Sequence, residues 1–160
     1  MSSPASIRNH PIHPMLVAIP LGLWIFALVC DIVRVCGGGG TWDTVALYST
    51  AGGIAGAILA AVPGFMDYLS IDEAKMKRIA TTHLLLGLGA IIIFAMDLWS
   101  RFRLSPESKV PLLLSGVGVL MIGFGGWLGG EMVYVKGMAV QAVEKLAEKE
   151  KKQPRLRRAS

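Results

Sequence analysis

Four long apolar runs, separated by short polar segments, dominate the chain. They cover approximately residues 15–35, 44–66, 79–99 and 111–135. A helix needs about 20 consecutive apolar residues to cross a bilayer, and each run is long enough to do so. The first run contains no charged residue before Asp31. The pattern predicts an all-α integral membrane protein, built as a bundle of four transmembrane helices.

The composition supports this prediction. Hydrophobic residues make up 53% of the 160 residues, and the mean hydropathy is +0.55, which is too apolar for an ordinary soluble domain. The length leaves room for one bundle and no second domain. We therefore divide the chain into an N-terminal arm (residues 1–14), a transmembrane domain (15–135) and a basic tail (136–160).

Basic residues predict the orientation. If four spans cross the membrane, Arg8, the second loop and the tail lie on one side with twelve lysines and arginines, and the other side holds four. Basic residues favour the cytoplasmic side. We therefore expect both termini in the cytoplasm, with the tail drawn to anionic lipid headgroups. Lipid contact explains the basic tail, so the sequence does not predict nucleic-acid binding.

Glycines in the second and fourth runs occur in pairs four residues apart, a spacing that lets two helix backbones approach closely. The pairs are Gly52/Gly56, Gly125/Gly129 and Gly126/Gly130. Close packing within the bundle is the simplest reason for them. They would also permit a homo-oligomer, or make room for a flat cofactor.

Topology brings ionisable residues from all four spans to the cytoplasmic level. His10 and His13 precede the first span, Asp67 ends the second, His83 begins the third and Glu131 lies near the end of the fourth. Ionisable groups are costly inside a membrane, so they tend to face the bundle interior and to mark sites. We therefore expect the candidate site at this level.

A second polar level, near the opposite face, contains Asp31 and Asp97. Here we favour interfacial capping and salt bridges, such as Asp31 with Arg34, over a functional site. A 4-3-4-3 spacing places one stripe of the third span between the two levels. Its residues are His83, Gly87, Ala90, Phe94 and Asp97.

The prolines around His10 and His13 restrict the arm. In a polyproline II segment the two imidazoles would lie roughly 9 Å apart. In a type I turn with Pro11 at its second position the two Cα atoms would come within about 7 Å, and the rings could converge. Pro14 suits the first position of a helix, and it disfavours the helical conformation for the residue before it. We therefore expect His13 just outside the first helix.

Three histidines at one depth suggest a cofactor. They could bind a transition metal, with Asp67 or Glu131 completing or orienting the ligand set. Alternatively, His83 with His10 or His13 could be the axial ligands of haem b. A hydrogen-bonded network that only holds the bundle together remains open, as do proton relay and quinone contact. No GxSxG or HExxH signature of a hydrolase occurs.

Several motifs resemble an uncharacterised bacterial membrane family, domain of unknown function 2231. They are His10-Pro11-Ile12-His13-Pro14 with Val17, Pro20-Leu21-Gly22-Leu23-Trp24, Asp31, Gly64-Phe65-Met66-Asp67-Tyr68, His83 and Gly126-Trp127-Leu128-Gly129-Gly130-Glu131-Met132-Val133-Tyr134. The resemblance implies a four-helix integral membrane domain in the bacterial cytoplasmic membrane. Fusion of some relatives to Rieske-type iron–sulfur domains implies a link to electron transfer. The family's basic-His-Gly sequence after the last tyrosine is replaced here by Val135-Lys136-Gly137.

We therefore predict a haem- or metal-binding redox module, rather than a stand-alone enzyme, with His10, His13 and His83 as candidate ligands. A Rieske-type protein is a possible redox partner. The alternatives are a non-catalytic scaffold or subunit and a small-solute transporter, for which four short helices would need to oligomerise.

Overall fold

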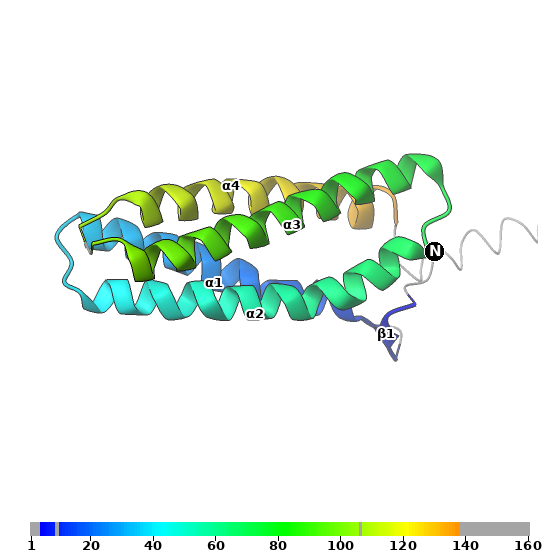
Figure 1. The fold of residues 1–160 in the computed structure, drawn as a ribbon. Helices are drawn as coiled ribbons and strands as arrows, with labels where there is room; N and C mark the ends of the chain where they lie inside the picture. The colour runs from blue at the N-terminus through cyan, green and yellow to red at the C-terminus, as the bar shows by residue number, and fades with distance from the viewer. Residues whose placement is uncertain (1–3, 9, 106, 138–160) are drawn as a thin grey trace, which may run out of the picture.

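Four long helices form the molecule, as the sequence predicts. The computed structural model describes residues 4–8, 10–105 and 107–137. The helices are α1 (Ile12–Val35), α2 (Thr41–Leu69), α3 (Ala74–Arg103) and α4 (Val110–Gly130), which a short π-helix, η1 (Glu131–Val135), continues (Figure 1). All four are long and apolar enough to cross a membrane. The protein is a multi-pass membrane protein, and most of its basic tail lies outside the described residues.

The helices run up and down as two hairpins. α1 packs mainly on α2 and α3 on α4, while α2–α3 and α1–α4 contacts join the hairpins. α1 and α3 therefore run in the same direction and lie diagonally across the bundle. The N-terminal arm and the α2–α3 connection lie at one end, here called the histidine end; the other two connections lie at the opposite end (Figure 1).

The first helix begins earlier than expected and includes His13. Pro14 is compatible with this because the first N–H groups of a helix have no partner within it. His10–Pro11 form a short strand, β2, paired with β1 (Ser6–Ile7), and Ile12 N–H donates to Ala5 O at 3.0 Å. The expected position of His13 outside the helix was therefore wrong.

Glycines allow close contact within each hairpin. A Cβ atom at Gly56 would lie 2.8 Å from Ile19 Cγ2, and one at Gly52 would lie 3.2 Å from Leu23 Cδ1. These contacts confirm the first small-residue pair. Gly125 and Gly129 likewise face α3, whereas a Cβ at Gly126 would meet nothing within 4 Å. The pair Gly126/Gly130 thus has no such packing role among the described residues.

The two hairpins bury corresponding positions. Five residues of α1 are buried, and four of the residues 70 positions later on α3 are buried too, while the side chain of the fifth, Arg101, is 5% exposed. The pairs are Pro20/Ala90, Trp24/Phe94, Ala27/Asp97, Cys30/Ser100 and Asp31/Arg101. Between α2 and α4 the offset is 65 positions, as in Thr50/Ser115, Gly53/Gly118 and Asp67/Met132. The bundle therefore consists of two similar hairpins, related by a pseudo-two-fold axis along the helices.

Candidate functional site

Two of the three histidines meet at the histidine end. His13 lies near the start of α1, and His83 lies in the third turn of α3. Their ring centres are 6.1 Å apart and their planes make an angle of 89°. Because α1 and α3 are diagonal partners, the two rings meet across the interior of the bundle.

Each ring is held in the same way by its own hairpin. His13 Nδ1 lies 2.8 Å from the Ala60 carbonyl oxygen on α2, and His83 Nδ1 lies 2.8 Å from the Gly125 carbonyl oxygen on α4. A carbonyl can only accept, so each Nδ1 carries the donated hydrogen. In the neutral ring, Nε2 then keeps a free lone pair.

Glycines line both rings one turn after the carbonyls that hold them. A Cβ atom at Gly64 would lie 2.7 Å from His13 Nδ1, and one at Gly129 would lie 3.3 Å from His83 Cε1. A larger residue in place of Gly64 would therefore displace His13, and a larger residue in place of Gly129 would crowd His83. These glycines create the space that the two imidazoles occupy.

The other predicted ligands lie apart from this pair. His10 is exposed on β2, and its Nδ1 donates to the Arg8 carbonyl oxygen at 3.0 Å. Glu131 is partly exposed, with Oε1 3.9 Å from Lys136 Nζ. Among the described residues, no group of three or more His, Cys, Asp or Glu could hold a metal ion. The β-hairpin fixes His10 outside helix α1, so a pair forms rather than the expected three-histidine set.

Asp67 anchors the arm at the same end. It is 8% exposed, and its Oδ1 accepts a hydrogen bond from Ala5 N–H at 3.2 Å. The carbonyl oxygen of Ala5 in turn accepts a hydrogen bond from the backbone N–H of Ile12, the first residue of α1. Asp67 thus helps to place the start of the helix that carries His13.

The opposite end contains a buried ionic network that joins all four helices. Arg101 Nη1 and Nη2 donate to the two carboxylate oxygens of Asp31, each at 2.8 Å, and Nη2 also donates to Asp97 Oδ2 at 3.0 Å. Ser115 Oγ donates to Asp31 at 2.8 Å and Thr50 Oγ1 to Asp97 at 3.2 Å. Both aspartates are fully buried.

The expected Asp31–Arg34 salt bridge was wrong. Instead, Arg34 Nε lies 2.9 Å from Asp43 Oδ1, and Arg34 Nη2 donates to the Ser108 carbonyl oxygen at 2.7 Å. Arg101 lies beyond the predicted third span (79–99) but is within α3, because that helix continues to Arg103. The four-residue spacing of Asp97 and Arg101 was the sequence signal for this contact.

An aromatic pair separates the two polar levels. Trp24 stacks on Phe94 with ring centres 4.1 Å apart, and its Nε1 donates to the Thr50 carbonyl oxygen at 3.3 Å. Ala90, Phe94 and Asp97 are buried, as the stripe predicts, but Gly87 is exposed. Apolar packing therefore lies between the histidine pair and the ionic network.

The DUF2231 family, described as predicted membrane proteins, matches residues 9–142. The chain belongs to the DUF2231 family. No curated protein and no solved structure matches it. Within this DUF2231 protein, the motif residues singled out above divide between the two ends. His10, His13, Asp67, His83 and Glu131 lie at the histidine end and Asp31 at the other.

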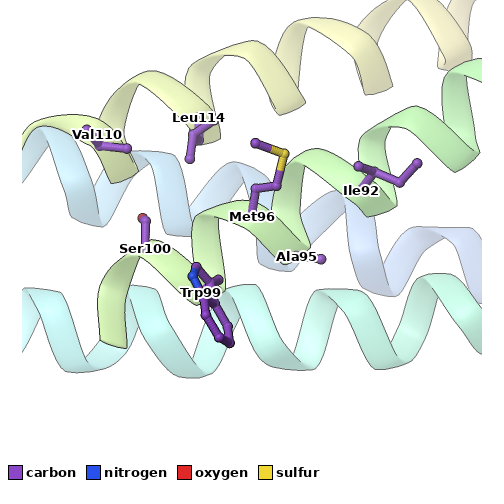
Figure 2. Close-up of a pocket in the computed structure, with 7 residues that line it drawn as sticks. All are labelled: Ile92, Ala95, Met96, Trp99, Ser100, Val110 and Leu114. Atoms are coloured by element: carbon purple, nitrogen blue, oxygen red, sulfur yellow. The ribbon is translucent and has the colours of Figure 1, made fainter. Parts of the chain in front are cut away.

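A separate apolar groove lies on the outer surface of this DUF2231 protein, between α3 and α4 (Figure 2). It is lined by Ile92, Ala95, Met96, Trp99, Ser100, Val110 and Leu114. Ile92, Met96 and Trp99 are 53%, 52% and 63% exposed. Large exposed apolar side chains on a membrane-spanning helix are typical of contact with lipid. The groove therefore belongs to the lipid-facing surface, and the histidine pair is the candidate site.

Proposed function

We propose that this protein is a redox module in which His13 and His83 bind a transition-metal centre, either the iron of haem b or a metal ion. One observation carries the proposal: two imidazoles from diagonal helices meet, each with Nδ1 tied to a backbone carbonyl. When bound, such a centre would supply one-electron transfer. A Rieske-type protein is the proposed partner, and the bacterial cytoplasmic membrane, with both termini cytoplasmic, the proposed location.

The separation of the rings fits two ligands on one metal. Metal–imidazole bonds are about 2.0–2.1 Å long, and a ring nitrogen lies roughly 1.1 Å from its ring centre, so two opposed ligands place their ring centres about 6.3 Å apart. The observed separation is 6.1 Å. The spacing of the two rings is therefore close to that of two opposed imidazole ligands.

The hydrogen bonds at Nδ1 also fit a metal site. Histidines that bind metals commonly donate their other N–H to a carbonyl or carboxylate, which fixes the tautomer and orients the ring. Both His13 and His83 have this arrangement. The glycine cradles at Gly64 and Gly129 support it because they define where each ring can lie.

The number of ligands favours haem over a site made by protein alone. Haem iron requires only two axial ligands from the protein. A tetrahedral ion would require two further donors. We propose that Asp67 and Glu131, at the same end of the bundle, orient or neutralise the ligands, and that His10, which is exposed on β2, takes no part in binding.

A structural role is the competing proposal, and the same contacts support it. The Nδ1 bonds tie α1 to α2 and α3 to α4. The pair would then only hold together a scaffold or subunit without a cofactor of its own. The two proposals differ in one respect that can be measured: the redox proposal predicts that the purified protein contains a metal centre, and the structural proposal predicts that it contains none.

The test is the dithionite-reduced minus oxidised visible spectrum of the protein, purified in mild detergent. The redox proposal predicts a redox-sensitive absorption that His83→Ala abolishes. His10→Ala is the matched control, because it removes an exposed histidine at the same end and should leave the spectrum unchanged. Loss of the signal in His10→Ala but not in His83→Ala would refute the ligand assignment. A colourless wild-type protein without bound metal would support the structural role instead.

A further inference from the structure

Corresponding residues of the two hairpins meet at three levels along the pseudo-two-fold axis. His13 meets His83 with ring centres 6.1 Å apart, and Trp24 stacks on Phe94 at 4.1 Å. At the third level, Asp31 binds Arg101 at 2.8 Å. In each case the second residue lies 70 positions after the first. The axis therefore passes through the histidine pair.

The surroundings of the histidines follow the same symmetry. The carbonyl that holds His13 belongs to Ala60, and the carbonyl that holds His83 belongs to Gly125, 65 positions later. The glycine that lies against His13 is Gly64, and its counterpart against His83 is Gly129. The two hairpins thus repeat the histidine, the hydrogen bond from its Nδ1 and the glycine against its ring.

The other two levels are not repeated in this way. At the ionic level the equivalent residues carry opposite charges, because two aspartates or two arginines would repel each other in a buried site. At the aromatic level a tryptophan faces a phenylalanine. These levels show that two hairpins can be joined through unlike residues. A structural tie therefore does not require identical histidines, whereas two identical ligands suit a group centred on the axis.

We propose that the group bound at this site lies on the pseudo-two-fold axis, with His13 and His83 as equivalent ligands on opposite sides of one metal atom. The proposal rests on the redox function proposed above. The chemistry it specifies is a metal atom with two opposite positions open to imidazole nitrogens. Haem iron has such positions, and so does a two-coordinate copper ion, which accepts imidazole well.

Equivalence predicts that changes to either histidine have equal effects. In a site that used His10 or an acidic residue as a third ligand, His13 and His83 would have different roles, and their variants would differ. The Nδ1 bonds are the same length in both halves. We therefore expect each imidazole to contribute about equally to affinity and to the reduction potential.

The experiment measures metal content, visible spectrum and reduction potential in wild type, His13→Met and His83→Met, with His10→Met as the control. Methionine can replace histidine as an axial ligand and raises the potential of haem iron. We expect both variants to keep the centre and to shift its potential upward by similar amounts, while His10→Met has no effect. His13→Ala and His83→Ala should each lose the centre, and added imidazole should restore it in both.

The outcomes separate this proposal from the proposed function. A centre that is present but responds to only one of the two variants, or that responds to His10→Met, overturns the axial arrangement and leaves the redox function standing. A wild-type protein without any centre overturns both. A Soret band with extractable haem identifies haem, and stoichiometric copper without that band identifies a bare ion. If an alanine variant fails to fold, the methionine variants still decide.

Discussion

Arg101→Met tests whether the buried ionic network holds the four helices together. The substitution keeps an unbranched side chain but removes the only cation that contacts Asp31 and Asp97 in the described network. Three hydrogen bonds of 2.8–3.0 Å are lost, and two fully buried carboxylates keep only their hydroxyl partners. Removing one partner of a buried ion pair costs about 3–5 kcal/mol. We expect a loss of unfolding free energy in that range.

The assay is unfolding in mixed micelles with increasing denaturing detergent, followed by helical circular dichroism. Arg103→Met is the matched control: Arg103 lies on the same helix, two residues away, and its guanidinium contacts the exposed ring of Trp99 at 4.8 Å. Loss of such a contact costs about 0.5–1 kcal/mol. A similar small loss for both variants would refute the reasoning, because it would mean that the buried network contributes no more than a surface contact.

Two further predictions concern single contacts. Asp31→Asn should destabilise the protein more than Asp97→Asn by about 1–3 kcal/mol. The reason is that Asp31 accepts two hydrogen bonds from Arg101 and one from Ser115, whereas Asp97 accepts one from Arg101 and one from Thr50. Equal losses in the same unfolding assay would contradict this order. Gly64→Ala should cost about 1–3 kcal/mol, because its Cβ would lie 2.7 Å from the ring it supports. Gly126→Ala, where a Cβ meets nothing within 4 Å, is the control and should change stability little; equal melting temperatures for both glycine variants would show that the cradle is not tight.

The sequence predicts the four spans well because apolar length alone determines which segments can cross a bilayer. It also places His13 and His83 at one depth, since they lie near the starts of the first and third spans, which run in the same direction in an up-and-down topology. It could not show that His10 lies apart, because that depends on a two-residue β-pairing with Ser6–Ile7. Spacing near a proline does not distinguish a strand from a turn.

The ionic network and the repeat were harder to predict for a different reason. Asp31 and Arg101 are 70 residues apart and meet only because α1 and α3 are diagonal partners. Apolar patterning does not determine which helices pack together. The repeat is equally hidden because several equivalent positions, such as Pro20 and Ala90, share burial rather than residue type.

The most direct test of the central claim is the number of metal atoms bound per polypeptide, measured by elemental analysis of the purified protein. The comparison is between wild type and the double variant His13→Ala/His83→Ala, with folding confirmed by circular dichroism. A histidine-bound centre on the bundle axis predicts one iron or copper per wild-type chain and none in the double variant. Equal metal content in the two proteins, or none in the wild type, would contradict it.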